Sequence, residues 1–306
     1  MANNEVAKQA PAAVAQRPNN LGALQGLLEK YKHQIAVALP RHMTPERMIR
    51  VALTAANSTY GLAECEPVTI AAAVVQASIL GLEPSSVLGE AYLVPFWNSK
   101  TRKKECQLIP GYLGLIKLAR NSDQVSIIDA QIVYSNDEFE FHKGSDVYWK
   151  HKWCREGDRG EAQGVWAGYV LKDGSKNFEY WTIDQIERHR DRYSKGAFDK
   201  EGHLTGAWRD SPEWMYKKTV LRQVIKLMPK SVEMATALAL DERADVGVGQ
   251  VFDAVPLELQ PDRVEESEML PEGQPKAAIE APKRKSESAK ATAAEPAVET
   301  EPTKEW

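Results

Sequence analysis

The chain begins and ends with segments that lack a regular alternation of hydrophobic and polar residues, and a patterned region lies between them. Residues 1–20 are mainly Ala, Asn, Gln and Pro, a composition typical of disorder. From about Val251 the composition shifts to Glu, Pro, Ala and Lys, which is typical of a disordered tail. We therefore predict a disordered arm over residues 1–20, a folded core over 21–245 and a disordered acidic tail over 246–306.

The core begins with segments whose hydrophobic spacing predicts helices. Thr44 and Pro45 are typical of a helix N-terminus, as the capping residue and the first helical residue. Gly81 can adopt the left-handed conformation that ends a helix, and Pro84 prevents its continuation. The predicted early helices cover residues 20–40, 43–59 and 68–80.

The middle of the chain is rich in short, alternating or apolar runs that predict strands. The polar loop 97–103 and the Asp173-Gly174-Ser175 turn are typical of hairpins. The predicted strands cover residues 90–96, 103–109, 125–135, 138–142, 164–172 and 176–182, and further helices cover 112–120, 182–192 and 211–229. The pattern predicts an α+β fold, with a small antiparallel sheet and hairpins in the middle of the chain and helices at both ends.

The predicted helix 211–229 combines an apolar side, which includes Trp214, with a row of cations. Lys218, Arg222 and Lys226 are four residues apart, so they line up along the helix. Like charges at this spacing repel each other. A row with no acidic member therefore indicates a polyanionic ligand, although a solvated face with flexible cations remains an alternative.

Other cations occur in several separate segments, while the overall charge is low. The net charge is −4, and residues 251–306 hold 7 Lys and Arg against 13 Asp and Glu, which leaves 32 basic and 30 acidic residues in the rest. A nearly neutral body with local basic clusters predicts a concentrated basic stripe. The cations outside the row are Lys103, Lys104, Lys117, Arg120, Arg190, Lys195 and Lys217; for the hairpin pair a solubilising loop is the alternative.

Gly111 and Tyr112 lie where an apolar strand ends and a helix begins. A glycine turn at a helix start can hold an anion, because backbone N–H groups point outwards there. The segment is not a nucleotide-binding loop, since no Gly-Lys-Ser/Thr follows Gly111. We expect Gly111 to turn the chain and to bring the backbone close to a phosphate, with Tyr112 beside it.

Motifs for catalysis are mostly absent from the sequence. The histidines form no short-spaced pair suited to zinc, and we expect no cofactor and no dedicated Mg²⁺ site on the protein. Glu138 and Glu140 share one side of a predicted strand, as in some metal-dependent nucleases, but such pairs are usually solvated. Trp149 and Trp153 flank a basic stretch that could stack single-stranded bases or cover a sheet edge; we favour the second.

The expected compartment follows from what the sequence lacks. It has no apolar run long enough for a membrane span and no secretion signal at its start. Its three cysteines are far apart in the sequence, which favours a reducing cytosol.

Five motifs occur in order along the chain: ALPRHMTPERMIR, LGLEPSSVLGEAYLVPF, QLIPGYLGLIKLAR, IVYSNDEFEFHKG and KKTVLRQVIKLMPKS. In their order and spacing they resemble the RecT family of phage and prophage single-strand DNA annealing proteins. The resemblance runs from about Gln34 to about Ser231. One departure is the stretch RNSDQ at residues 120–124, where relatives often have Arg-Ser-Gly.

The resemblance implies a non-enzymatic, ATP-independent protein of homologous recombination that binds single-stranded DNA and anneals complementary strands. It also implies a fold distantly like that of eukaryotic strand-annealing ring proteins, and assembly into rings or helical filaments. The expected partners are single-stranded DNA, the annealed duplex, other copies of the chain, an exonuclease and the host single-strand-binding protein, the last two through the tail. A phage or prophage protein would work in the bacterial cytoplasm, with no membrane partner.

Annealing requires that the pairing edges of the bases stay free, so we expect the grip to be on phosphates. A single-strand coating protein that slows annealing is the main alternative, and a metal-dependent nuclease is another. The predicted DNA-binding residues are Lys103, Lys104, Gly111, Tyr112, Lys117, Arg120, Arg190, Lys195, Lys217, Lys218, Arg222 and Lys226. Among them we place Lys117, Arg120, Lys218, Arg222 and Lys226 on phosphates and Gly111 and Tyr112 at the groove floor. Lys103, Lys104, Arg190 and Lys195 would guide the strand or its complement.

Overall fold

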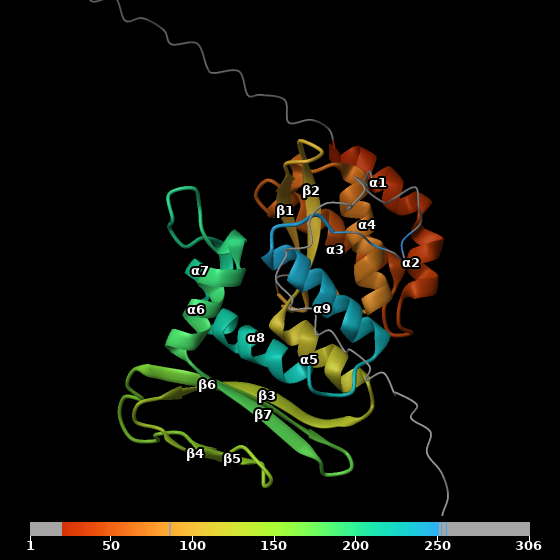
Figure 1. Ribbon diagram of the computed structural model, residues 1–306. Coiled ribbons are helices and arrows are strands. Elements are labelled where there is room, and N and C mark those ends of the chain that lie inside the picture. Colours follow the sequence, from red (N-terminus) through yellow and green to blue (C-terminus); the bar gives the residue numbers. More distant parts are fainter. Residues whose placement is uncertain (1–19, 86, 251, 253–254, 256–306) are drawn as a thin grey trace, which may run out of the picture. The chain divides into compact units, whose positions relative to one another are not determined.

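A computed structural model describes residues 20–85, 87–250, 252 and 255, and it begins with a helical layer (Figure 1). Its helices are α1 (Asn20–Lys30), α2 (Lys32–Ala38), α3 (Pro45–Ser58) and α4 (Pro67–Leu80), with a short 3-10 turn, η1 (Leu62–Glu64), between the last two. The hydrophobic segment predicted as one helix over 20–40 is thus two helices that meet at Tyr31. α4 is apolar almost all round and is buried among the others.

The capping residues predicted for the start of α3 and the end of α4 are confirmed. The Thr44 hydroxyl accepts a hydrogen bond from the Arg47 N–H at 3.3 Å, which caps the start of α3. Gly81 has a φ of 67° and ends α4 in the left-handed conformation.

A hairpin and a short helix follow α4. Strands β1 (Ala91–Asn98) and β2 (Lys103–Pro110) pair antiparallel, and β2 packs on α4. Helix α5 (Tyr112–Asn121) begins directly after β2 and lies close to the backbone that precedes β1, because Gly111 and Gly114 leave no side chain between them. A Cβ on Gly114 would overlap the carbonyl oxygen of Glu90.

The central sheet is antiparallel in the order β3–β6–β7, and a second hairpin lies against one of its faces (Figure 1). Strands β3 (Val125–Tyr134), β6 (Ala162–Leu171) and β7 (Lys176–Thr182) form the sheet, and β4 (Glu138–His142) pairs with β5 (Tyr148–Lys152). Ile128 and Ala130 face the helices, whereas Gly168 faces the β4–β5 hairpin. The hairpin therefore shields an aromatic layer on the side of the sheet opposite the helices.

The last part of the core returns to helices, as predicted. The elements are α6 (Ile183–Tyr193), η2 (Lys195–Ala197), α7 (Gly206–Asp210), α8 (Pro212–Ile225) and α9 (Val232–Asp245). α8 packs on β6, β3 and α5 and so joins the sheet to the rest of the core. The α+β class is confirmed, with small antiparallel sheets in the middle and helices at both ends.

Besides the short helices η1, η2 and α7, two longer elements were not predicted, β5 and α9. The Trp-rich stretch that forms β5 carries Trp149, whose indole lies 5.2 Å from the Phe178 ring and 5.9 Å from Trp166. Trp149 thus covers a sheet face rather than a sheet edge. The missed helix α9 packs on β2 and follows α8 after a short turn.

The described structure continues beyond residue 245, where composition places the start of the tail. The Gln250 side-chain amide accepts a hydrogen bond from the Leu108 N–H at 2.7 Å and donates to the Leu108 carbonyl at 2.9 Å. Phe252 and Val255 are also buried. The predicted disordered arm, up to residue 19, and the tail from residue 256 lie outside the described residues.

Within the described ranges, the helices are all too short or too polar to cross a membrane.

Candidate nucleic-acid interface

The cation row on α8 is paired with carboxylates from α9. Lys218 lies 2.6 Å from Asp241, Arg222 lies 3.2 Å from Asp241, and Arg222 also contacts Asp245. The prediction that this row lacks acidic partners is therefore wrong, because α9 supplies them from elsewhere in the sequence.

Burial makes the pairing on α8 part of the core. Lys218 is only 7% exposed and Asp241 is 1% exposed. Burial lowers the pKa of the Arg222 guanidinium, but the nearby Asp241 and Asp245 outweigh this effect, and the pKa lies above its ordinary value. Lys218 and Arg222 consequently hold α8 against α9. Lys226, at the end of the row, is half-exposed and lies 2.9 Å from Glu242.

Three further predicted cations have carboxylate partners on neighbouring segments. Lys117 of α5 lies 2.8 Å from Glu90 and is mostly shielded from solvent. On the β1–β2 hairpin, Lys104 contacts Glu64, and Lys103 lies 3.5 Å from Glu66. The hairpin pairs remain about half-exposed, so their free energy is small and a polyanion could compete for them.

Arg190 is also built into the core, whereas Lys195 is exposed. The Arg190 guanidinium carbon lies 5.6 Å from the Phe198 ring centroid and 5.5 Å from that of Trp208. Its Nε also donates to Asp191 at 2.8 Å. Arg190 therefore fixes the loop that follows α6, and it has little surface left for a ligand.

The backbone N–H of Gly111 and the hydroxyl of Tyr112 already contact acceptor groups within the protein. The Gly111 N–H donates to the Glu90 carbonyl at 2.8 Å, and a Cβ at this position would overlap the carbonyl oxygen of Gly89. The Tyr112 hydroxyl lies 3.4 Å from the Ala130 carbonyl oxygen, and burial raises the pKa of this phenol well above its ordinary value. Gly111 thus serves close backbone packing, and Tyr112 is neutral at all ordinary pH values.

An open hollow of about 480 Å³ lies between α5, β3 and α8, and we call it the α5–α8 hollow. Its two cations, Arg120 and Lys217, are both among the predicted residues, and so is Tyr112, which also lines the hollow. Neither cation forms an ion pair with any residue in the described ranges. The lining residues are Tyr112, Leu113, Ile116, Arg120, Ile127, Ile128, Asp129, Gln131, Trp214 and Lys217.

Trp214 also lines this hollow, but the sequence analysis did not predict it as a binding residue. Its hydrophobic spacing placed it with the apolar side of α8, yet it is 51% exposed. The Trp214 and Tyr112 ring centroids are 5.4 Å apart, and the Lys217 Nζ lies 5.1 Å from the Trp214 centroid. The signal that could have found it is its position in the first turn of α8, three residues before Lys217.

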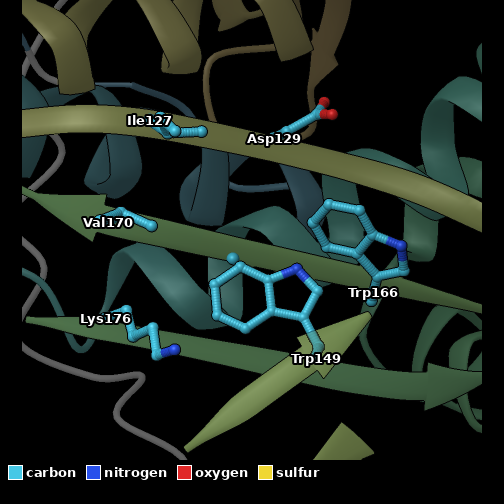
Figure 2. Close-up of a pocket in the computed structure, with 7 residues that line it drawn as sticks. Ile127, Asp129, Trp149, Trp166, Val170 and Lys176 are labelled. Atoms are coloured by element: carbon cyan, nitrogen blue, oxygen red, sulfur yellow. The ribbon is translucent and has the colours of Figure 1, made fainter. Parts of the chain in front are cut away.

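A second hollow, of about 350 Å³, lies between the sheet and the β4–β5 hairpin (Figure 2). Figure 2 shows the Trp149 indole lying across β6, with Lys176 on the neighbouring strand β7. Gly168 makes this possible, because a Cβ there would lie 2.7 Å from Trp149. Ile127 and Asp129 of β3 line both hollows, so β3 separates them.

Glu138 and Glu140, the acidic residues considered for metal catalysis, are both exposed. Glu138 lies 2.7 Å from Lys152, and Glu140 is opposite Lys150 in the β4–β5 register. Among the described residues, one group of side chains is spaced closely enough to hold a metal ion. It consists of Asp199, Glu201 and His203, which are exposed and lie on a loop.

The site is thus a hollow with two cations that lack ion pairs and one exposed tryptophan, in a mixed α+β protein. The RecT family model matches residues 46–254, which is most of the described chain. The chain therefore belongs to the RecT family, the single-strand annealing recombinases that its sequence motifs resemble.

The individual relatives agree with this assignment. The chain is 44% identical to "Protein RecT" of Escherichia coli (strain K12) over 226 residues, which are 73% of this chain and 81% of that protein. It is 28% identical over 195 residues to the uncharacterized protein YqaK of Bacillus subtilis (strain 168), covering 62% of this chain and 63% of that protein.

Proposed function

We propose that the protein binds single-stranded DNA across the α5–α8 hollow and anneals complementary strands without ATP. The observation that carries this proposal is the meeting of Arg120 and Lys217 in one open hollow, neither of them in an ion pair with any described residue. Cations that no carboxylate neutralises retain their full attraction for phosphates. Family membership supports single-stranded DNA as the ligand.

The chemistry of annealing follows from this mode of binding. Arg120 and Lys217 neutralise phosphates, which lowers the repulsion between the bound strand and an incoming one. Contacts to phosphates carry no sequence information, so the choice of partner strand is left to base pairing. No covalent bond changes, and the protein acts here as a binding surface rather than an enzyme.

The other predicted contacts divide into two groups under this proposal. Lys103 and Lys195 are exposed and Lys104 is partly exposed, so all three can guide the strand or its complement towards the hollow. The remaining predicted contacts act by holding α5, α8 and the loop after α6 in place. They are Gly111, Lys117, Arg190, Lys218, Arg222 and Lys226.

Assembly and partners form the outer part of the proposal. Self-association into a ring or filament would align many hollows along one strand, and Mg²⁺ would act through the DNA. The acidic segment after residue 255 would contact an exonuclease or the host single-strand-binding protein, and its negative charge would disfavour binding to the DNA site.

The test combines annealing with strand binding at several salt concentrations. In the absence of ATP, the protein should accelerate the pairing of complementary oligonucleotides; slower pairing would favour a coating protein, and strand breakage on adding Mg²⁺ would favour a nuclease. Arg120→Gln with Lys217→Gln should weaken binding on all sequences alike and reduce the salt dependence by about two contacts.

Arg50→Gln is the matched control for this pair. Arg50 is an exposed arginine on α3, outside the residues that line the hollow. Its replacement should leave both binding and the salt dependence unchanged. Equal effects of the control and of the double variant would contradict the assignment of the hollow.

A further inference from the structure

Trp214 has an unusual amount of exposed aromatic surface for a residue in a helix that packs on the core. It follows Pro212 in the first turn of α8, and half of its side chain remains in contact with solvent. Leaving a large aromatic ring in water forfeits the hydrophobic free energy that burial would provide. An exposed indole at the mouth of a hollow is therefore well placed to be covered by a ligand.

The surroundings of Trp214 supply both an apolar wall and positive charge. Leu113 and Ile127 are exposed apolar side chains in the same lining. Lys217 lies beside the indole on α8, and Arg120 lines the hollow from α5. A flat, apolar group with an anion attached to it matches this combination, and a nucleotide within a strand has that chemistry.

We propose that Trp214 stacks on one nucleobase of the bound strand in each protomer, while Lys217 and Arg120 hold the adjoining phosphates. This inference rests on the proposed single-strand binding function and refines it. Stacking on an indole is tolerant of sequence, because every base offers a flat face. It therefore fixes the position of the strand without choosing its sequence.

The consequence for annealing is a division of labour along the strand. The base on Trp214 is fixed in position through its stacked face, whereas its neighbours, held only through their phosphates, are free to adjust to a complement. One stacked base per protomer also sets the register of the strand on an assembly of protomers.

An apolar segment of a partner protein could cover the same indole, but two features favour DNA. Both cations of the hollow lack an ion pair with a described residue, and Asp129 is the one carboxylate in the lining. That carboxylate already accepts hydrogen bonds from the Ala130 N–H at 2.8 Å and the Gln131 amide at 3.0 Å.

The experiment compares two ligands of equal charge, a short oligo-dT strand and a strand of the same length made of abasic sites. Affinities are measured by fluorescence anisotropy with the full chain at one salt concentration. The wild-type protein should bind the strand with bases at least about fivefold more tightly, as expected for one aromatic stack. Trp214→Leu should abolish most of this preference and leave the affinity for the abasic strand unchanged.

Two further variants make the test specific. Trp214→Phe retains an aromatic face and should retain most of the preference for bases. Trp153→Leu removes another exposed tryptophan, 53% exposed, that does not line the hollow, and it should behave as the wild type.

The outcomes separate this inference from the function on which it rests. A Trp214→Leu protein that keeps the full preference for bases, or that loses affinity for both strands equally, would overturn the stacking. The double variant Arg120→Gln, Lys217→Gln should instead weaken the binding of both strands equally and leave the ratio of the two affinities unchanged. Failure of that second result would count against the phosphate site, whatever Trp214 does.

Discussion

Lys218 on α8 and Asp241 on α9 form an ion pair at 2.6 Å inside the protein, although 23 residues separate them in the sequence. The same carboxylate also lies 3.2 Å from Arg222. A row of cations that would suit a polyanion on the surface is here a link between two helices. Because this pair is buried, a change to either residue should affect the stability of the fold.

Removing one partner of the pair should destabilise the protein strongly. Asp241→Ala leaves the Lys218 ammonium buried and unpaired and should lower the free energy of unfolding by about 3–5 kcal/mol, whereas Lys218→Ala leaves the buried Asp241 carboxylate with Arg222 as its remaining partner and should cost less. The double change Lys218→Met with Asp241→Leu should recover much of the larger loss, because neither member of the pair is left buried alone and Arg222 keeps Asp245 as a partner. Urea unfolding measures all three proteins.

The same variants decide whether Lys218 contacts DNA. If its role is structural, the stable Lys218→Met, Asp241→Leu protein should bind single-stranded DNA about as well as the wild type. Weak binding by this folded protein, with an unchanged unfolding midpoint, would restore Lys218 to the DNA interface.

What the sequence could predict depends on how local the physical cause is. The caps at Thr44 and Gly81 are set by residues within one helical turn, and both were predicted. The pairing of Lys218 and Arg222 depends on tertiary contact with α9, so the spacing of the cations alone could not reveal it. A usable signal existed, since Asp241 and Asp245 are also four residues apart.

The residues that line the candidate hollow were predicted in part for the same reason. Arg120, Lys217 and Tyr112 meet there because α5 and α8 pack on β3. Trp214 was assigned to the apolar side of its helix, because periodicity cannot tell a buried position from one at the rim of a hollow.

Gly111 should be sensitive to any added side chain. Gly111→Ala places a Cβ against the carbonyl oxygen of Gly89, and backbone on both sides cannot easily move. We expect a loss of at least about 1–3 kcal/mol in the free energy of unfolding, as in other overpacked sites. Gly26→Ala on α1 is the control, since nothing lies within 4 Å of a Cβ there, and it should be neutral or slightly stabilising.

The segment after α9 should be required for a stable core. Gln250→Ala leaves the buried Leu108 N–H and carbonyl without their partner, which should lower the free energy of unfolding by about 1–3 kcal/mol. A chain truncated after residue 245 should be less stable than one truncated after residue 255. Equal unfolding midpoints for the two truncated chains would contradict a structural role for this segment.

His189 should make the folded protein less stable as the pH falls. Its ring lies between Trp181, at 5.3 Å, and Tyr193, at 4.8 Å, and burial together with the nearby Arg222 lowers its pKa below the ordinary value of about 6.5. Just below that pH the His189 imidazole binds a proton in the unfolded chain, whereas in the folded chain it stays neutral until the pH is lower. The free energy of unfolding should therefore decrease as the pH falls through about 6.5, and it should be fully retained above it.

Replacing His189 isolates this contribution. His189→Asn should reduce the difference between the urea midpoints at about pH 7.5 and about pH 5.5, whereas the exposed His33→Asn should leave it unchanged. Asp137 does not interfere, because its hydrogen bond to Arg159 holds its pKa well below the ordinary value, and its loss of stability comes only in strong acid. An unchanged difference in the His189→Asn protein would show that the imidazole binds its proton equally well in both states.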